Sequence, residues 1–343
     1  MALQPDALMP SHRVPPDIAP WLLIAALAAG AFFVMASPST WLTLTVAGLA
    51  MGLMLFIIAS GLTLVFGLMD VLNFGHGVFI ATGAFVATTV LGPAGFGAPG
   101  SWLLAPEPAL QILAVLAAMV LAMVLTGALG FLFERVIVRP VYGQHLKQIL
   151  ITMGGMIVVE ELIKSIWGAQ AIALPLPECL RGVYLLGDAA IERFRLFAVL
   201  IGLGVLLALS QLLSRTKIGL LVRAGVQDRE MVESLGYPVR RLFVAVFVAG
   251  SALAGLGGAL WGLYQQTITA QIGAQVNVLI FIVIIMGGLG SVTGSLLAAL
   301  LVGLMANYTG FLAPKIALFS NIGLMVAVLS WRPQGLRALA SSR

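Results

Sequence analysis

Long stretches without charged side chains dominate the hydrophobic pattern of this chain. No Asp, Glu, Lys or Arg occurs in residues 18–69, 71–106, 108–133 or 242–314. A helix that crosses a bilayer needs about 20 apolar residues, so the longer stretches must cross more than once. With breaks placed at Pro, Gly and charge clusters, the pattern predicts ten helices, at residues 20–36, 41–66, 72–92, 109–133, 148–168, 195–213, 242–264, 276–288, 291–309 and 316–331.

The distribution of basic residues predicts the orientation of these helices. If both termini are cytoplasmic, 13 of the 18 Lys and Arg residues fall on the inside, as the positive-inside rule requires. We therefore expect an all-α polytopic membrane protein with about eight to ten transmembrane helices and cytoplasmic N- and C-termini. The expected domains are a cytoplasmic extension (1–20), a transmembrane domain (21–336) that contains a cytoplasmic loop (214–241), and a cytoplasmic tail (337–343).

Composition narrows the classes of protein. Hydrophobic residues make up 61% of the chain and charged residues 9%, which excludes both a soluble domain and a disordered chain. The net charge of +5 is explained by cytoplasmic loops rather than by nucleic-acid binding. The single cysteine and three dispersed histidines match no metal-ligand spacing, so we expect no metal and no cofactor on this chain. No Walker A motif is present, so the chain is not expected to hydrolyse ATP.

The loop 214–241 is the most charged segment. Within it, residues 223–235 carry apolar positions at helical spacing, and Gly236 followed by Pro238 is a stop signal. The pattern predicts one short amphipathic helix parallel to the membrane. Two interpretations stay open, namely a solvated helix that only maintains orientation and a docking element for a cytoplasmic partner.

A polar interruption separates the second and third predicted helices. Between two apolar stretches stand Asn73, Gly75, His76 and Gly77. Polar groups at membrane depth are often found on a transport pathway or at a helix break, where Asn73 would cap a half-helix. Alternatively, the segment is a turn at the cytoplasmic surface, where His76 costs little.

Two acidic residues in the fifth predicted helix have a structural interpretation. Glu160 and Glu161 precede Lys164 at i,i+4 and i,i+3 spacing, which predicts ion pairs at the outer end of that helix. A proton relay would instead require an isolated acid deeper in the bundle. The outer loop 168–192 is expected to be an ordered lid or an irregular connector.

Four segments carry a resemblance to a known family. GLTLVFGLMDVLNFGHG (residues 61–77) and MGGLGSVTG (286–294) resemble the two signatures of bacterial branched-chain amino acid ABC-transporter permeases. RAGVQDREMVESLG (223–236) is similar to the coupling segment of that family, and RPQGL (332–336) to its C-terminal ending. The resemblance extends from about residue 41 to residue 336.

This resemblance implies an inner-membrane permease subunit with four kinds of neighbour: a second related permease, two cytoplasmic ATPase subunits that bind ATP and Mg²⁺, a periplasmic solute-binding protein, and membrane lipid. It implies no nucleic-acid partner and no enzymatic activity of the chain itself. The pathway and helix-break residues would be Asn73, Gly75, His76, Gly77, Gly288 and Gly290. The residues coupled to the ATPase would be Arg223, Asp228, Arg229, Glu230, Glu233, Leu235 and Gly236.

The expected substrates are branched-chain or other hydrophobic amino acids. Permeases for urea and short-chain amides share the same signatures, and these substrates, together with the aromatic carboxylates expected for some relatives, form the alternative. An ion-coupled secondary transporter is a hypothesis of another class, and it would need Asp70, His76 or the Glu160 and Glu161 pair as an ionisable group in the membrane.

Overall fold

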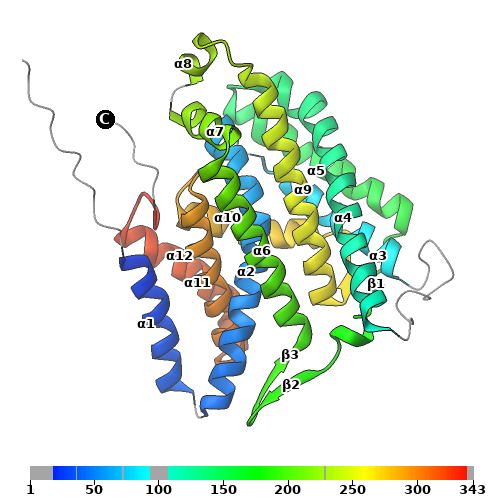
Figure 1. Cartoon of the computed structure of the whole chain (residues 1–343), viewed down its shortest axis with the longest axis vertical. Helices are drawn as coiled ribbons and strands as arrows, with labels where there is room; N and C mark the ends of the chain where they lie inside the picture. Colours follow the sequence, from blue (N-terminus) through cyan, green and yellow to red (C-terminus); the bar gives the residue numbers. More distant parts are fainter. Residues whose placement is uncertain (1–17, 36, 72, 93–106, 228, 338–343) are drawn as a thin grey trace, which may run out of the picture.

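The computed structural model describes residues 18–35, 37–71, 73–92, 107–227 and 229–337, and these form a helical bundle (Figure 1). Ten helices match the ten predicted from the sequence. They are α1 (Ala19–Val34), α2 (Pro38–Met69), α3 (His76–Leu91), α4 (Pro108–Phe133), α5 (His145–Trp167), α6 (Arg193–Arg215), α9 (Val239–Gln265), α10 (Ile272–Gly287), α11 (Val292–Leu312) and α12 (Ala317–Trp331). Five described helical spans are long and apolar enough to cross a membrane, so the chain is a multi-pass membrane protein.

Local signals in the sequence explain where several helices begin. Ser37 caps α2 because its hydroxyl accepts a hydrogen bond from Thr40 N, and Pro38 occupies the first turn, where a missing N–H costs nothing. Ser291 caps α11 in the same way through Gly294 N. After α4, the chain continues through a π-helical turn (Glu134–Val138) and a 3-10 turn (Arg139–Val141).

The core of the bundle is built on α2 and α9, which cross in direct backbone contact. A Cβ on Gly250 would lie 2.7 Å from the carbonyl oxygen of Gly61, so both positions must be glycine for this approach. α2 is apolar on all sides and mostly buried, as expected for a central helix. Peripheral helices instead expose apolar side chains, including Val120 and Val124 on α4, which face the lipid.

Two of the four shortest bundle helices, α3 and α10, begin inside the bundle and are called half-helices below. α2 and α9 each end with a residue of positive φ, Asp70 (φ 50°) and Gln266 (φ 55°), and these are the two non-glycine residues of positive φ in the described chain. Six residues then lead into each half-helix, 70–75 into α3 and 266–271 into α10, and each half-helix has 16 residues. The predicted start of the third helix at residue 72 is therefore wrong, because residues 73–75 form the non-helical return into the bundle.

The two half-helices run in opposite directions from a shared starting point. Gly77 and Gly273, each the second residue of its half-helix, pack backbone to backbone. From there α3 leads toward the end of α5, where Thr89 accepts a hydrogen bond from Trp167 Nε1 (2.8 Å), whereas α10 leads toward the C-terminal turn, where Leu336 N donates to Met286 O (2.9 Å). α11 packs on α2 as α4 packs on α9. The two halves of the chain thus form an inverted repeat.

The two ends of the bundle carry different structures (Figure 1). Two short helices, α7 (Lys217–Gln227) and α8 (Arg229–Ser234), cap one end, hereafter the α7–α8 end. The opposite, hairpin end holds the antiparallel pair β2 (Val183–Leu186) and β3 (Ala189–Glu192), together with a 3-10 turn (Glu178–Leu180). There too, β1 (Ile172–Ala173) pairs with β4 (Thr267–Ile268), so the outer loop 168–192 is ordered.

Both ends of the described chain lie at one side of the bundle. Leu23, in the first turns of α1, and Trp331, at the end of α12, line the same groove. The chain therefore enters and leaves the bundle at the same end, which agrees with the predicted even number of crossings. The predicted extension (1–20) lies almost entirely outside the described residues, as does the tail after residue 337.

Candidate translocation and coupling sites

The segment between α2 and α3 places His76 deep inside the bundle. The His76 side chain is 1% exposed, and its Nε2 lies 3.2 Å from the carbonyl oxygen of Ile58. Ile58 precedes the end of α2 by three turns, about 16 Å along the helix. The surface-turn interpretation of His76 is therefore wrong. The hydrogen bond with the backbone carbonyl of Ile58 offsets part of the free-energy cost of burying the imidazole.

Neighbouring elements hold the returning segment by its backbone at Phe74. Phe74 N donates to Thr152 Oγ1 on α5 (3.2 Å), and Phe74 O accepts from Asn277 Nδ2 on α10 (3.0 Å). The Phe74 ring stacks on Phe281, with centroids 4.6 Å apart. A segment with no secondary structure of its own is thus fixed by partners from two other helices, which satisfies backbone groups that lipid cannot.

Asn73 does not have the predicted capping role. The N-cap of α3 is Gly75, and it makes no side-chain hydrogen bond. Asn73 is 1% exposed, and its Oδ1 has no hydrogen-bond partner among the described residues. Its carbonyl instead accepts from His76 N (3.3 Å), so the backbone rather than the side chain closes the first turn.

Glycines allow the close approaches around this segment. A Cβ on Gly75 would lie 2.7 Å from Cζ of Phe133 and 2.9 Å from the carbonyl oxygen of Thr152. A Cβ on Gly77 would lie 2.7 Å from the carbonyl oxygen of Gly273. Any larger residue at either position would displace backbone from backbone, so these glycines are needed for packing.

Gly288 and Gly290 lie elsewhere, at the C-terminal end of α10. Both have positive φ (98° and 82°), which explains why glycine occupies them. Gly288 packs against the turn formed by residues 334–337, and Gly290 packs against Gly67 near the end of α2. The predicted pathway residues therefore lie in two places. Asn73 to Gly77 lie in the bundle interior near the start of α10, whereas Gly288 and Gly290 lie at the α7–α8 end, where α10 ends.

Three residues of this region were missed by sequence reasoning. They are Gln266, Gly273 and Asn277. Gln266 and Gly273 are the counterparts of Asp70 and Gly77 in the second repeat, and Asn277 donates a hydrogen bond to Phe74 O. The sequence indicates the repeat only weakly, because the two halves share little beyond three pairs of glycines, and the two glycines of each pair are the same number of residues apart. Gly61, Gly77 and Gly92 precede Gly257, Gly273 and Gly288 by the same number of residues.

The predicted coupling segment forms two helices rather than one. α7 begins at Lys217, six residues before the predicted start, and α8 ends at Ser234. Arg223 lies on the backbone of α7, Arg229, Glu230 and Glu233 lie on that of α8, and Asp228 lies outside the described residues. The predicted stop is confirmed: Gly236 has a φ of 83°, and α9 begins directly after Pro238.

α7 rests on the end of α2. A Cβ on Gly225 would lie 2.9 Å from Leu68 Cδ1, and Val222 is buried. Between α7, the end of α2 and α9 lies a cavity of about 330 Å³ whose lining includes Asp70, Tyr142, His145, Gly225 and Phe243. Two of these lining residues are close together, with His145 Nε2 3.6 Å from Asp70 Oδ2. The coupling segment therefore contacts the residues that lead directly into the helix break.

Several large apolar side chains of this segment are exposed although it lies beyond the helical bundle. Met231, Leu235 and Tyr237 expose 60%, 69% and 50% of their surface. Ile218 and Leu220 on α7 are also exposed. A cluster of exposed apolar side chains at the polar end of a membrane protein is typical of a protein-docking surface.

The remaining acidic candidates form ion pairs. Lys164 Nζ lies 3.1 Å from Glu160 Oε1 and 2.7 Å from Glu161 Oε1, so the predicted pairing is confirmed. Among the residues that the structure describes, no group of three or more His, Cys, Asp or Glu side chains is placed to hold a metal ion.

Comparison with known proteins matches residues 44–329 to the family described as the permease component of the branched-chain amino acid transport system. The permease protein BraD of the high-affinity branched-chain amino acid transport system of Pseudomonas aeruginosa is 28% identical, over 84% of this chain and 93% of that protein. The corresponding protein LivH of Escherichia coli is 27% identical, over 84% and 92%. LivM of Escherichia coli is 29% identical over 41% of this chain and 33% of that protein. No solved structure matches the chain significantly.

Proposed function

Because the chain belongs to the family of branched-chain amino acid transport permeases, we propose that it is the permease subunit of an ATP-driven importer for branched-chain or other hydrophobic amino acids. The observation that carries the proposal is the contact between a surface-exposed helical segment, α7–α8, and the broken helix pair α2–α3. A transporter subunit driven by an external motor needs such a mechanical link. In this proposal the chain is a transporter subunit, which moves the solute across the membrane without changing the covalent structure of the solute.

The link predicts how movement reaches the membrane interior. α7 contacts Leu68, two residues before Asp70, and the return from Asp70 to Gly75 leads to the buried start of α3. A displacement of α7 toward or away from the bundle changes the position of this return first, because it is held by single hydrogen bonds at Phe74 rather than by a helix. Discontinuous helices are where transporters commonly change access.

The orientation follows from charge. Described basic residues at the α7–α8 end include Arg135, Arg139, Lys147, Arg215 and Lys217, whereas the hairpin end holds fewer. The positive-inside rule assigns the α7–α8 end to the cytoplasm, where ATPase subunits would contact the apolar side chains of Met231, Leu235 and Tyr237. The hairpin end then faces the periplasm, where a solute-binding protein would deliver the substrate.

The partners in this proposal are a second related permease, two ATPase subunits and a periplasmic binding protein. LivM supports a second permease, because a protein of that name in Escherichia coli resembles nearly half of this chain. ATP and Mg²⁺ would be bound by the ATPase subunits. Arg223, Asp228, Arg229, Glu230, Glu233, Leu235 and Gly236 are proposed to contact them, and Asn73, Gly75, His76, Gly77, Gly288 and Gly290 to shape the helix break and the bend after α10.

Reconstitution tests the proposal directly. The chain is incorporated into liposomes with its second permease, ATPase subunits and binding protein, and uptake of radiolabelled leucine is measured. We expect uptake that requires ATP on the ATPase side and is inhibited by isoleucine and valine, but not by urea or benzoate. Inhibition by urea or benzoate instead would identify the alternative substrates. Uptake driven by a proton or sodium gradient without ATP would contradict the proposal.

A further inference from the structure

Helix α5 carries charged side chains at the depth of the lipid hydrocarbon. In the described bundle helices, Glu160 and Glu161 are the only Asp, Glu, Lys or Arg residues that lie more than one turn from a helix end. α5 has 23 residues and is about 35 Å long, compared with about 30 Å for the hydrocarbon core of a bilayer. Glu160 lies about 10 Å along the helix from Trp167, the last residue of α5, so it lies inside the hydrocarbon layer.

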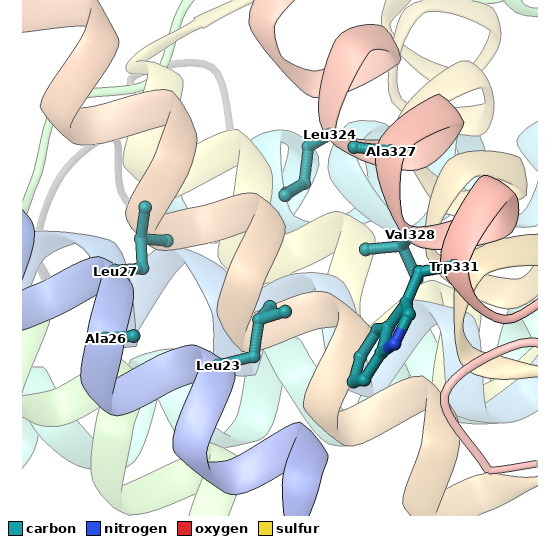
Figure 2. Close-up of a pocket in the computed structure, with 7 residues that line it drawn as sticks. All are labelled: Leu23, Ala26, Leu27, Leu324, Ala327, Val328 and Trp331. Atoms are coloured by element: carbon teal, nitrogen blue, oxygen red, sulfur yellow. The ribbon is translucent and has the colours of Figure 1, made fainter.

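Other outward-facing helices present only apolar side chains at this depth. Val120 on α4 is 59% exposed, and α4 contains no charged residue. The groove of about 370 Å³ between α1 and α12 is also apolar, and Figure 2 shows Leu23 and Leu27 of α1 facing Leu324 of α12 across it. On α5, by contrast, 63% of the Glu161 side chain is exposed. Because an ionised group in contact with hydrocarbon is costly, this face of α5 must contact water or polar groups rather than lipid.

Glu160 reaches the point where the two half-helices begin. Its side chain is 20% exposed, and it lines a narrow cavity with Met156 of α5, Gly77 of α3, and Gly273 and Ala274 of α10. From this cavity α3 and α10 each run about 24 Å toward opposite ends of the bundle, so the cavity lies near the middle of the membrane. The cavity has a volume of about 10 Å³, so a solute can reach Glu160 from the exposed side of α5 or after the half-helices separate.

Glu160 shares its cation with a second carboxylate. Lys164 Nζ lies 3.1 Å from Glu160 Oε1 and 2.7 Å from Glu161 Oε1, so one ammonium group pairs with two carboxylates and leaves a net charge of −1. Each carboxylate can accept more hydrogen bonds than one shared ammonium group supplies. An excess negative charge at this depth favours a second cation, and a primary ammonium group would donate charge-assisted hydrogen bonds to the carboxylate as Lys164 does.

We propose that Glu160 binds the ammonium group of the transported amino acid as the substrate passes along the exposed face of α5. This inference rests on the proposed function, because every α-amino acid with an apolar side chain carries that ammonium group. Neutral urea and anionic benzoate offer no cation to the carboxylate, so Glu160 favours amino acids over the alternative substrates. Glu161 and Lys164 keep this face hydrated, and the ion pair with Lys164 orients the Glu160 carboxylate.

The number of leucine molecules transported per ATP hydrolysed tests this role, measured in the reconstituted complex with the second permease, the ATPase subunits and the binding protein. Glu160→Gln should lower this ratio about tenfold, because the ammonium group loses its charged partner while ATP hydrolysis continues. Glu160→Asp keeps the charge and should retain more of the ratio. A defect in folding or assembly would lower uptake and ATP hydrolysis together and would leave the ratio unchanged.

Glu161→Gln is the matched control. It also leaves Lys164 with one carboxylate, but it changes a more exposed residue outside the cavity lining, and its ratio should stay within about twofold of the wild-type value. A second pair of variants applies if Glu160→Gln does not assemble. Met156→Lys places a cation four residues before Glu160 in the same cavity, where it competes for the carboxylate, and should lower the ratio. Met153→Lys, one turn earlier and outside the lining, is its control.

The outcomes separate this inference from the proposed function. A lower ratio in Glu160→Gln or Met156→Lys, but not in its control, supports the inference. An unchanged ratio in Glu160→Gln, or in Met156→Lys if Glu160→Gln does not assemble, would overturn it, as would an equal loss in a variant and its control. Absence of leucine uptake by the wild-type complex would instead overturn the proposed function.

Discussion

Gly77 and Gly273 are in backbone contact where the two half-helices α3 and α10 begin, and a Cβ on Gly77 would lie 2.7 Å from the carbonyl oxygen of Gly273. Each glycine is the second residue of its half-helix, and the half-helices run toward opposite ends of the bundle. The contact therefore joins the two inverted halves of the chain at their closest point. It also places the two helix N-termini, with their partial positive charge, next to each other inside the membrane.

Substitution of Gly273 by valine should destabilise the protein by about 3 kcal/mol, because the added atoms meet backbone that has no room to move. We expect a lower melting temperature of the purified chain and loss of transport. Gly154→Val on α5 is the matched control, because no atom lies within 4 Å of a Cβ at that exposed position. Equal melting temperatures for both variants would show that the half-helices tolerate separation.

Replacement of His76 by alanine should cost about 2 kcal/mol, because it leaves a small cavity and removes the partner of the Ile58 carbonyl. His76→Gln should recover part of this loss, because the amide can donate to the same oxygen. His145→Ala serves as the control, since that side chain is largely exposed and should change stability little. Thermal unfolding of the purified variants measures all three, and a wild-type melting temperature for His76→Ala would contradict the buried placement.

The double substitution Met231→Asp and Leu235→Asp should abolish co-purification of the ATPase subunits without affecting insertion of the chain. Both side chains are more than half exposed, so carboxylates are tolerated in the folded chain but are unfavourable in an apolar contact. Leu185→Asp on β2 at the hairpin end is the control, with 73% of its surface exposed. If the double variant retains the ATPase subunits, docking occurs elsewhere.

The reactivity of Cys179 should depend strongly on pH. Burial raises the pKa of this thiol above its usual value, although two backbone N–H groups and the charge of Arg193 act in the opposite direction. A raised pKa leaves less thiolate at any pH below it, so maleimide labelling should be slow near pH 7 and accelerate as pH rises. A variant that combines Cys179→Ser with Leu185→Cys gives an exposed thiol for comparison. Equal labelling rates at pH 7 would contradict the prediction.

Most of the helical architecture was predictable because it follows from apolar run length. All ten bundle helices lie within a few residues of their predicted positions, and the ion pairs of Lys164 follow from helical spacing alone. The charge and spacing of the loop 214–241 predicted one short helix, whereas the structure has two, α7 and α8. This division was not predicted, because the positions of Val222 and Gly225 depend on contacts with the end of α2 rather than on local propensity.

The half-helices required the tertiary structure. In sequence, residues 70–77 are compatible with a surface turn or with a return into the bundle, since both need glycine and a polar residue. The decision depends on Thr152 and Asn277, which lie far away in the chain and supply the hydrogen bonds that make a non-helical backbone possible inside a membrane.

The sequence by itself determined that this is a multi-pass membrane protein, where its helices lie and where its charged loop lies, because these depend on the cost of placing charge in hydrocarbon. It also carried the motifs that identify the family. Only the tertiary structure decided that α3 and α10 begin inside the bundle, that His76 is buried, and that Gly288 and Gly290 lie a half-helix away from Asn73. These features depend on which distant backbone groups meet, and no local pattern of residues encodes that.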